Sequence, residues 1–148
     1  LLTNDYDNNF SSTFVYKDQG GKLVFGPPWD FDLSYGNHTL NPSTSTINMY
    51  HLLYALGELP WFKTLLIERW NNINTDNGLI NQMKDQIHEY TETYTHYFES
   101  NHVMWQNTRT TGGWHFYAQS GIHSQADGAT HFYNWLVERI AFIDTYLT

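Results

Sequence analysis

The chain has no cysteine among its 148 residues. This excludes a disulfide framework, a thiolate metal site and a catalytic thiol. Basic residues are also scarce, because 7 Lys and Arg stand against 15 Asp and Glu, for a formal net charge of −8. Such a chain is repelled by nucleic-acid phosphates and by anionic membranes. We therefore expect no nucleic-acid partner, whereas a cation or a basic protein suits the charge. No apolar stretch approaches the length of a membrane span, so none is expected.

Apolar residues, by contrast, are plentiful: 41% of the chain is hydrophobic and 18% is aromatic. This is enough to build a core, so residues 1–148 are expected to form one folded domain or part of one. The chain begins with Leu1 and shows no signal-peptide pattern. We therefore expect it to be a segment of a longer protein. Its many Asn and Thr residues favour an exported bacterial protein.

The first 37 residues predict a β-hairpin with an acidic loop on either side. Residues 13–17 and 23–25 are rich in β-branched and aromatic side chains, which favour strands. The turn signal Asp18-Gln19-Gly20-Gly21 separates them. Pairing should stop at Pro27, which has no N–H to donate. A surface loop is expected over residues 34–46.

Residues 46–148 predict helices, so the expected fold class is α+β and mostly α. An apolar run over residues 47–56 ends at Gly57, and Pro60 suits the first turn of a second helix. Asp76 or Asn77 would cap a third helix. Apolar residues at helical spacing predict the buried stripes of the second and third helices: Trp61, Phe62, Leu65, Leu66 and Trp70 in the second, and Ile80, Met83, Ile87, Tyr90 or Thr91, Tyr94 and Phe98 in the third. At most a short helix is expected near 114–119. A last helix is expected over 129–147, with a buried face formed by Phe132, Trp135, Leu136, Ile140 and Ile143.

The most informative stretch is Gly26-Pro27-Pro28-Trp29-Asp30-Phe31-Asp32-Leu33-Ser34-Tyr35-Gly36-Asn37. In an extended backbone, residues two apart point the same way, so Asp30 and Asp32 are expected to face one side. Trp29, Phe31 and Leu33 should then form an apolar anchor on the other side, with Trp29 buried. Two converging carboxylates supply the oxygen ligands that a hard cation such as Mg²⁺ prefers. The simpler interpretation is a turn that buries a tryptophan and leaves two solvated acids.

The hairpin should also bring the loop before it close to the segment after it. Asp7 would then approach Asp30, and a hairpin flanked by two acidic loops is the layout of a protein-kinase C-lobe. In that lobe one Asp accepts the proton of the substrate hydroxyl, and another Asp, followed by Phe, holds Mg²⁺ against the nucleotide phosphates.

Several motifs resemble those of the spore coat protein H (CotH) kinase-like family, which commonly shows "YKD…GKL…GPVWDFD" followed by Gly-Asn. The matching runs here are Tyr16-Lys17-Asp18, Gly21-Lys22-Leu23, the run from Gly26 to Leu33, and Gly36-Asn37, with Pro28 in place of the usual Val. Residues 134–144 resemble the closing "W-L-x-x-R" helix of the family. The resemblance runs over nearly the whole chain and is most specific in residues 5–37.

The resemblance implies roles for particular residues. Asp30 would be the ligand of Mg²⁺ or Mn²⁺, and Asp7 the group that orients the acceptor hydroxyl. Asp32 would add a metal or cofactor ligand, or cap the following turn. Ser12 stands five residues after Asp7, where kinases have a second-metal Asn, so Ser12 and Asn9 are candidate cofactor-binding residues.

The activity implied is that of an atypical protein kinase, with transfer of the ATP γ-phosphoryl group to Ser or Thr of a protein. Its partners would be ATP and a protein substrate of basic, Ser-rich sequence, at the cell surface or spore coat of a bacterium. The chain would be the C-lobe portion of the domain, without the N-lobe, and inactive alone. Two alternatives are a non-catalytic, pseudokinase-like interaction module and a domain that binds or cleaves glycans with Asp7 and Asp30.

Overall fold

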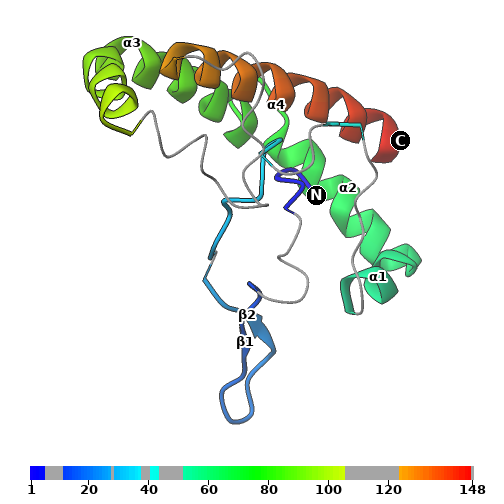
Figure 1. Cartoon of the computed structure of the whole chain (residues 1–148). Coiled ribbons are helices and arrows are strands. Elements are labelled where there is room, and N and C mark those ends of the chain that lie inside the picture. The colour runs from blue at the N-terminus through cyan, green and yellow to red at the C-terminus, as the bar shows by residue number, and fades with distance from the viewer. Residues whose placement is uncertain (6–11, 28, 38–40, 44–51, 106–123, 148) are drawn as a thin grey trace.

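The computed structural model in Figure 1 describes residues 1–5, 12–27, 29–37, 41–43, 52–105 and 124–147. A two-stranded hairpin, formed by β1 (Val15–Tyr16) and β2 (Val24–Phe25), is followed by four helices. These are α1 (Leu52–Gly57), α2 (Pro60–Ile73), α3 (Leu79–Trp105) and α4 (Gln125–Leu147). The predicted class, mostly α with a short N-terminal hairpin, is confirmed. None of these described helices has both the length and the apolarity that crossing a membrane requires.

The hairpin is shorter than its sequence pattern suggested but has the expected turn. Val15 pairs with Phe25 and Tyr16 with Val24 in an antiparallel register. In the turn the Gly21 N–H donates to the Asp18 carbonyl over 2.9 Å. The last cross-strand bond runs from the Gly26 N–H to the Phe14 carbonyl, at 2.6 Å. Pro27 follows it, so pairing ends where proline was expected to stop it.

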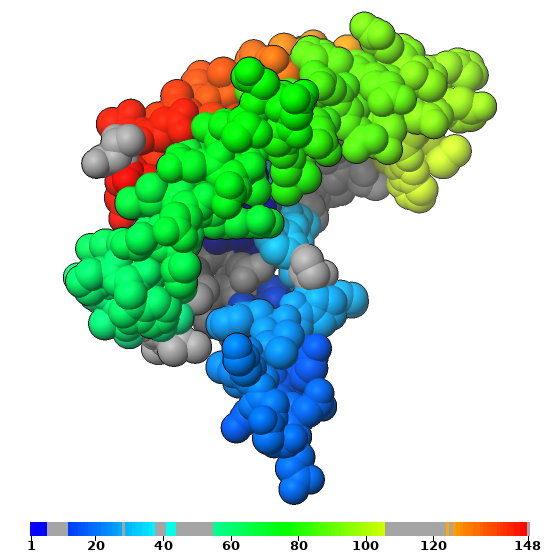
Figure 2. Space-filling model, turned by 180° about the vertical axis from the view of Figure 1, so that it is seen from behind, coloured from blue at the N-terminus to red at the C-terminus, as the bar shows by residue number. Residues whose placement is uncertain are grey.

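Both strands of the hairpin are open to solvent. Figure 2 shows it as a narrow projection that extends away from the helices. Its large apolar side chains are each at least 41% exposed: Phe14, Val15, Tyr16, Leu23, Val24 and Phe25. The hairpin therefore contributes nothing to the core within the described residues.

The core lies where α2, α3 and α4 meet, and α4 supplies most of it. Leu136 and Ile143 are fully buried, as the apolar stripe of the last helix predicted. They pack with Ile140, with Trp70 at the end of α2 and with Ile80 at the start of α3. In Figure 1, α3 runs alongside α4, and α2 leads away from them to α1. The buried positions of α4 that the sequence predicted are confirmed in Trp135, Leu136, Ile140 and Ile143.

A polar contact also joins α2 to α4. The Trp70 Nε1–H donates to Asp144 Oδ1 over 2.6 Å, and the Asn74 amide donates to the same oxygen over 2.9 Å. Asn74 is the residue that ends α2. One carboxylate of α4 therefore fixes the indole in the core and the end of the neighbouring helix.

Two predicted helix starts are wrong by a few residues. The last helix begins at Gln125 and not at Ala129, because the Ser124 hydroxyl accepts the Asp127 N–H at 3.0 Å and caps it. The third helix begins at Leu79, directly after Gly78, so its cap is neither Asp76 nor Asn77. The helix expected over 47–56 is described from Leu52 onward, as α1, and its residues 47–51 lie outside the described residues. The short helix expected near 114–119 also lies outside them.

The predicted buried stripes of the two middle helices are only partly confirmed. Trp61 and Leu65 of α2 are 56% and 52% exposed, and Tyr90 and Tyr94 of α3 are 46% and 43% exposed. Figure 1 shows the reason, since α2 reaches α4 only near its C-terminal end. Apolar spacing identified the helices, whereas the neighbours that a helix meets decide which turns are buried.

The segment after the hairpin packs against the helices, contrary to the expected surface loop. Ser34 is buried, and Gly36 lies against Trp135 of α4. Gly36 has φ of +86°, and a Cβ there would lie 2.6 Å from Trp135 Cδ1. Tyr35 completes the contact with its ring 5.0 Å from Phe132 and 6.1 Å from Trp135. These contacts attach the segment after the hairpin to α4.

We predict that Gly36→Ala lowers the free energy of unfolding by about 2–5 kcal/mol, because it adds a positive-φ penalty to a steric clash with a buried indole. Thermal or urea unfolding would measure it. Gly57→Ala is the matched control, since a Cβ there meets nothing within 4 Å. A loss no larger than that of the control would show that Trp135 has room to move.

Candidate functional site

The site is built where the chain enters and leaves the hairpin. Ser12 precedes β1 and Asp30 follows β2, and the Ser12 hydroxyl lies 3.5 Å from Asp30 Oδ2. Ser12 is 5% exposed, whereas Asp30 is exposed. Antiparallel pairing of the strands between them explains how residues 18 positions apart meet. Two residues predicted for the site are therefore side by side.

The backbone at Asp30 is not extended, which corrects the expected side-by-side carboxylates. Asp30 has φ of +61°, in the left-handed region that Asp and Asn tolerate better than most residues. The alternation that would align Asp30 with Asp32 requires extended backbone and does not apply here. Asp32 lies in a turn and is exposed, and its carbonyl accepts the Asn37 amide over 2.5 Å.

The segment before the hairpin is tied to the segment after it at a second place. The Ser34 hydroxyl donates to Asp5 Oδ2 over 2.8 Å, and the Tyr35 N–H donates to the Thr3 carbonyl, also over 2.8 Å. The sequence identified neither Asp5 nor Ser34 as a site residue. Asp5 could have been identified because it lies two residues before Asp7. No sequence feature pointed to Ser34.

Asp7 and Asn9 lie outside the described residues, so their predicted roles stay predictions. The described neighbours on either side, Asp5 and Ser12, contact Ser34 and Asp30 respectively. The described residues that border this loop, Asp5 and Ser12, therefore both contact the segment over residues 30–34. The meeting of the two acidic loops stays a prediction.

Arg139 of α4 binds the segments on both sides of the hairpin region to the helices. Its guanidinium is fully buried and donates to the Leu1 carbonyl through Nε at 3.1 Å and Nη2 at 2.7 Å. Its Nη1 donates to the Pro42 carbonyl at 2.8 Å. Burial lowers the pKa of Arg139 to about 10, so it remains charged at neutral pH. The Arg of the "W-L-x-x-R" pattern is therefore a structural anchor for both segments.

The donor set fits a magnesium ion that is shared with phosphate. Asp30 offers an exposed carboxylate, and the Ser12 hydroxyl lies 3.5 Å from its Oδ2. Within the described part of the chain, no three His, Cys, Asp or Glu side chains gather closely enough to hold a metal alone. Mg²⁺ is commonly held by one or two carboxylates together with substrate phosphates. The residues fit that kind of site and not a closed protein cage.

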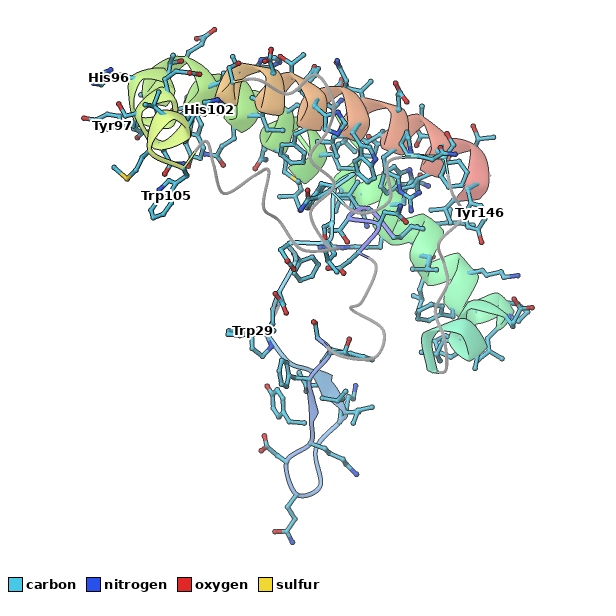
Figure 3. All side chains as sticks on the ribbon, in the orientation of Figure 1. Trp29, His96, Tyr97, His102, Trp105 and Tyr146 are labelled. Carbon is cyan, nitrogen blue, oxygen red and sulfur yellow. The ribbon has the colours of Figure 1, made fainter. Side chains whose placement is uncertain are left out.

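The prediction that Trp29 is buried is wrong. The ring is 60% exposed, and Figure 3 shows it pointing away from the helices. It contacts Phe14 edge-to-face, with ring centroids 6.5 Å apart. Of the three residues expected to form the apolar anchor, Leu33 is buried, at 6% exposed, and Phe31 is half-buried. Leu33 lies in the turn that follows Asp30 and is buried there, whereas Trp29 is largely in water.

Comparison with known families gave one match. The family model described as "CotH kinase protein" matches residues 1–142 of the 148-residue chain. No curated protein and no solved structure matches it.

We predict that Arg139→Met lowers the free energy of unfolding by about 2–4 kcal/mol, because the Leu1 and Pro42 carbonyls lose a charged donor. Urea unfolding would measure the loss. Arg69→Met, at an exposed position of α2, should change stability by no more than about 0.5 kcal/mol. Equal effects of the two substitutions would contradict the anchoring role.

We also predict that Trp29→Ala costs no more than about 1 kcal/mol, since most of the ring is already in water. Trp70→Ala should cost about 3–5 kcal/mol, because its indole is buried and hydrogen-bonded to Asp144. Melting curves of the two variants give the comparison. A large loss for Trp29→Ala would mean that the ring is covered in solution.

Proposed function

Because this chain belongs to the CotH kinase protein family, we propose that it carries the metal and acceptor site of a protein kinase of this type. The reaction is transfer of the ATP γ-phosphoryl group to a Ser or Thr hydroxyl of a protein. The observation that carries the proposal is the contact between Ser12 and Asp30 across the base of the hairpin. It supports an arrangement in which the loop that carries Asp7 and the loop that carries Asp30 lie close together.

Each residue has a separate task in this proposal. Asp30 is the carboxylate that binds Mg²⁺ or Mn²⁺. When bound, the ion neutralises the charge of the phosphates. Asp7 accepts a hydrogen bond from the acceptor hydroxyl and orients it for in-line attack on the γ-phosphorus. Asn9 is a further candidate contact to the nucleotide.

Charge explains why the proposal needs a cation. The chain carries a formal net charge of −8, and the nucleotide is itself a polyanion. Phosphoryl transfer is catalysed mainly by positioning and by neutralising charge on the transferred group. Carboxylates alone would repel the phosphates, whereas carboxylates with a bound divalent cation attract them. The same negative charge favours a protein substrate of basic, Ser-rich sequence.

A second candidate function is a non-catalytic interaction module with the same scaffold. Ser12 favours it, because kinases have Asn at the corresponding place, as ligand of a second metal ion. The exposed ring of Trp29 also favours a binding surface, including one for glycans, on which aromatic rings stack. Transfer of phosphate separates the two candidates.

We predict that the full-length protein transfers ³²P from ATP to a basic, Ser-rich protein in the presence of Mg²⁺ or Mn²⁺. Asp7→Ala and Asp30→Asn should each lower the rate about 100-fold or more. Asparagine is chosen at position 30 because it tolerates positive φ and keeps the side-chain volume. Asp85→Ala, on the exposed face of α3, is the control and should retain the rate.

Transfer that survives both substitutions would refute the assignment of these two residues. Absence of transfer by the wild-type protein, across a panel of basic Ser-rich substrates, would favour the non-catalytic module instead.

A further inference from the structure

Ser12 differs from its surroundings because it is buried while the carboxylate that it contacts is exposed. Ser12 is 5% exposed, and its hydroxyl lies 3.5 Å from Asp30 Oδ2. A serine hydroxyl has one hydrogen to donate, and an ionised carboxylate can only accept. The direction of the bond is therefore fixed, from Ser12 to Asp30.

We propose that Ser12 is a positioning residue, which holds the Asp30 carboxylate in one orientation and is not itself the ligand of a second metal ion. This inference rests on the proposed function. In sequence, Ser12 stands five residues after Asp7, where kinases have the Asn that binds a second metal, but its hydroxyl contacts the carboxylate proposed for the first. Its task in this chain would thus be to orient the existing ligand.

The local backbone explains why Asp30 needs such a partner. Asp30 lies on the solvent-exposed side of a segment that follows a projecting hairpin, and its φ of +61° sets the direction of its side chain. An exposed carboxylate turns freely about χ1 and χ2, and that freedom must be lost when it binds a metal. A buried hydroxyl, held by the fold, removes part of this freedom beforehand. Hydrogen-bond partners of metal ligands commonly act in this way.

The same segment is already fixed on its other side. Ser34 donates to Asp5, and Tyr35 pairs with Thr3 and packs on Trp135. The backbone after Asp30 is therefore anchored. The side chain of Asp30 still has to be oriented by a separate contact. Ser12 is the described side chain that contacts that carboxylate.

The test is a double-mutant cycle on the affinity for Mn²⁺. Electron paramagnetic resonance measures the binding of Mn²⁺ to the full-length protein in the presence of a non-hydrolysable ATP analogue. The variants are Ser12→Ala, Ser12→Thr, Asp30→Asn and the double variant Ser12→Ala with Asp30→Asn. Ser124→Ala is the matched control, because it removes a hydroxyl that caps α4 far from the site. Melting temperatures without metal report the stability of each variant.

We expect Ser12→Ala to weaken the affinity for Mn²⁺ about tenfold. This is the lower end of the loss that follows when a hydrogen-bond partner of a metal ligand is removed, and it is expected here because the contact between Ser12 and Asp30 is long. Ser12→Thr keeps the hydroxyl and should recover most of the loss. The double variant should bind as weakly as Asp30→Asn alone, since Ser12 acts through that carboxylate. Ser124→Ala should lower the melting temperature and leave Mn²⁺ affinity unchanged.

Wild-type affinity in Ser12→Ala would overturn the inference. So would further loss in the double variant, which would make Ser12 a direct ligand, or an equal loss in Ser124→Ala, which would make the effect one of general stability. Wild-type affinity in Asp30→Asn is a different result, because it removes the metal site of the proposed function itself.

Discussion

The buried guanidinium of Arg139 is the interaction on which the arrangement of this chain depends. It lies in the middle of α4 and binds the carbonyl groups of Leu1 and Pro42, which come from the two sides of the hairpin region. A charged group is costly to bury, and here the cost is offset because the donors on three of its nitrogens find carbonyl acceptors. The helices thus determine the position of both segments that lead to the site. The remaining contacts with the helices are apolar, from Leu1, Leu2 and Tyr35 on the core and from Gly36 on Trp135.

Much of the fold could be predicted from the sequence because it depends on local patterns. Spacing of apolar residues located α4 and its buried face, and the turn signal between two β-branched runs located the hairpin. The errors arose where distant residues decide the outcome. Gly36 reads as part of a polar loop, yet it lies against Trp135, almost a hundred residues later in the chain. Trp61 and Leu65 fit a buried stripe, yet the part of α2 that carries them does not reach α4.

The candidate site shows the same division between local and distant information. The motif around Asp30 identified the carboxylate, and the spacing from Asp7 in the kinase pattern identified Ser12 as a candidate residue. It did not predict the conformation, because a positive φ at Asp30 changes which side chains share a face. Of the residues expected on the apolar face, Leu33 is buried and Trp29 is exposed. The link between Asp5 and Ser34 depends on folding across 29 positions, and no local pattern contains it.

The exposed hairpin is consistent with a role in bringing loops together more than with a role in stability. A two-stranded hairpin is marginally stable by itself, and here its strands bury nothing against the helices. Its base is nevertheless closed by the bond from Gly26 to Phe14 and by the contact of Ser12 with Asp30. Antiparallel pairing sets the distance between the two ends of the hairpin, and Arg139 and Trp135 set their position on the helices. The Asp30 carboxylate, although exposed, therefore has a defined position. That position is set by the hairpin and by Arg139 and Trp135 of α4, which lie outside the motif around Asp30.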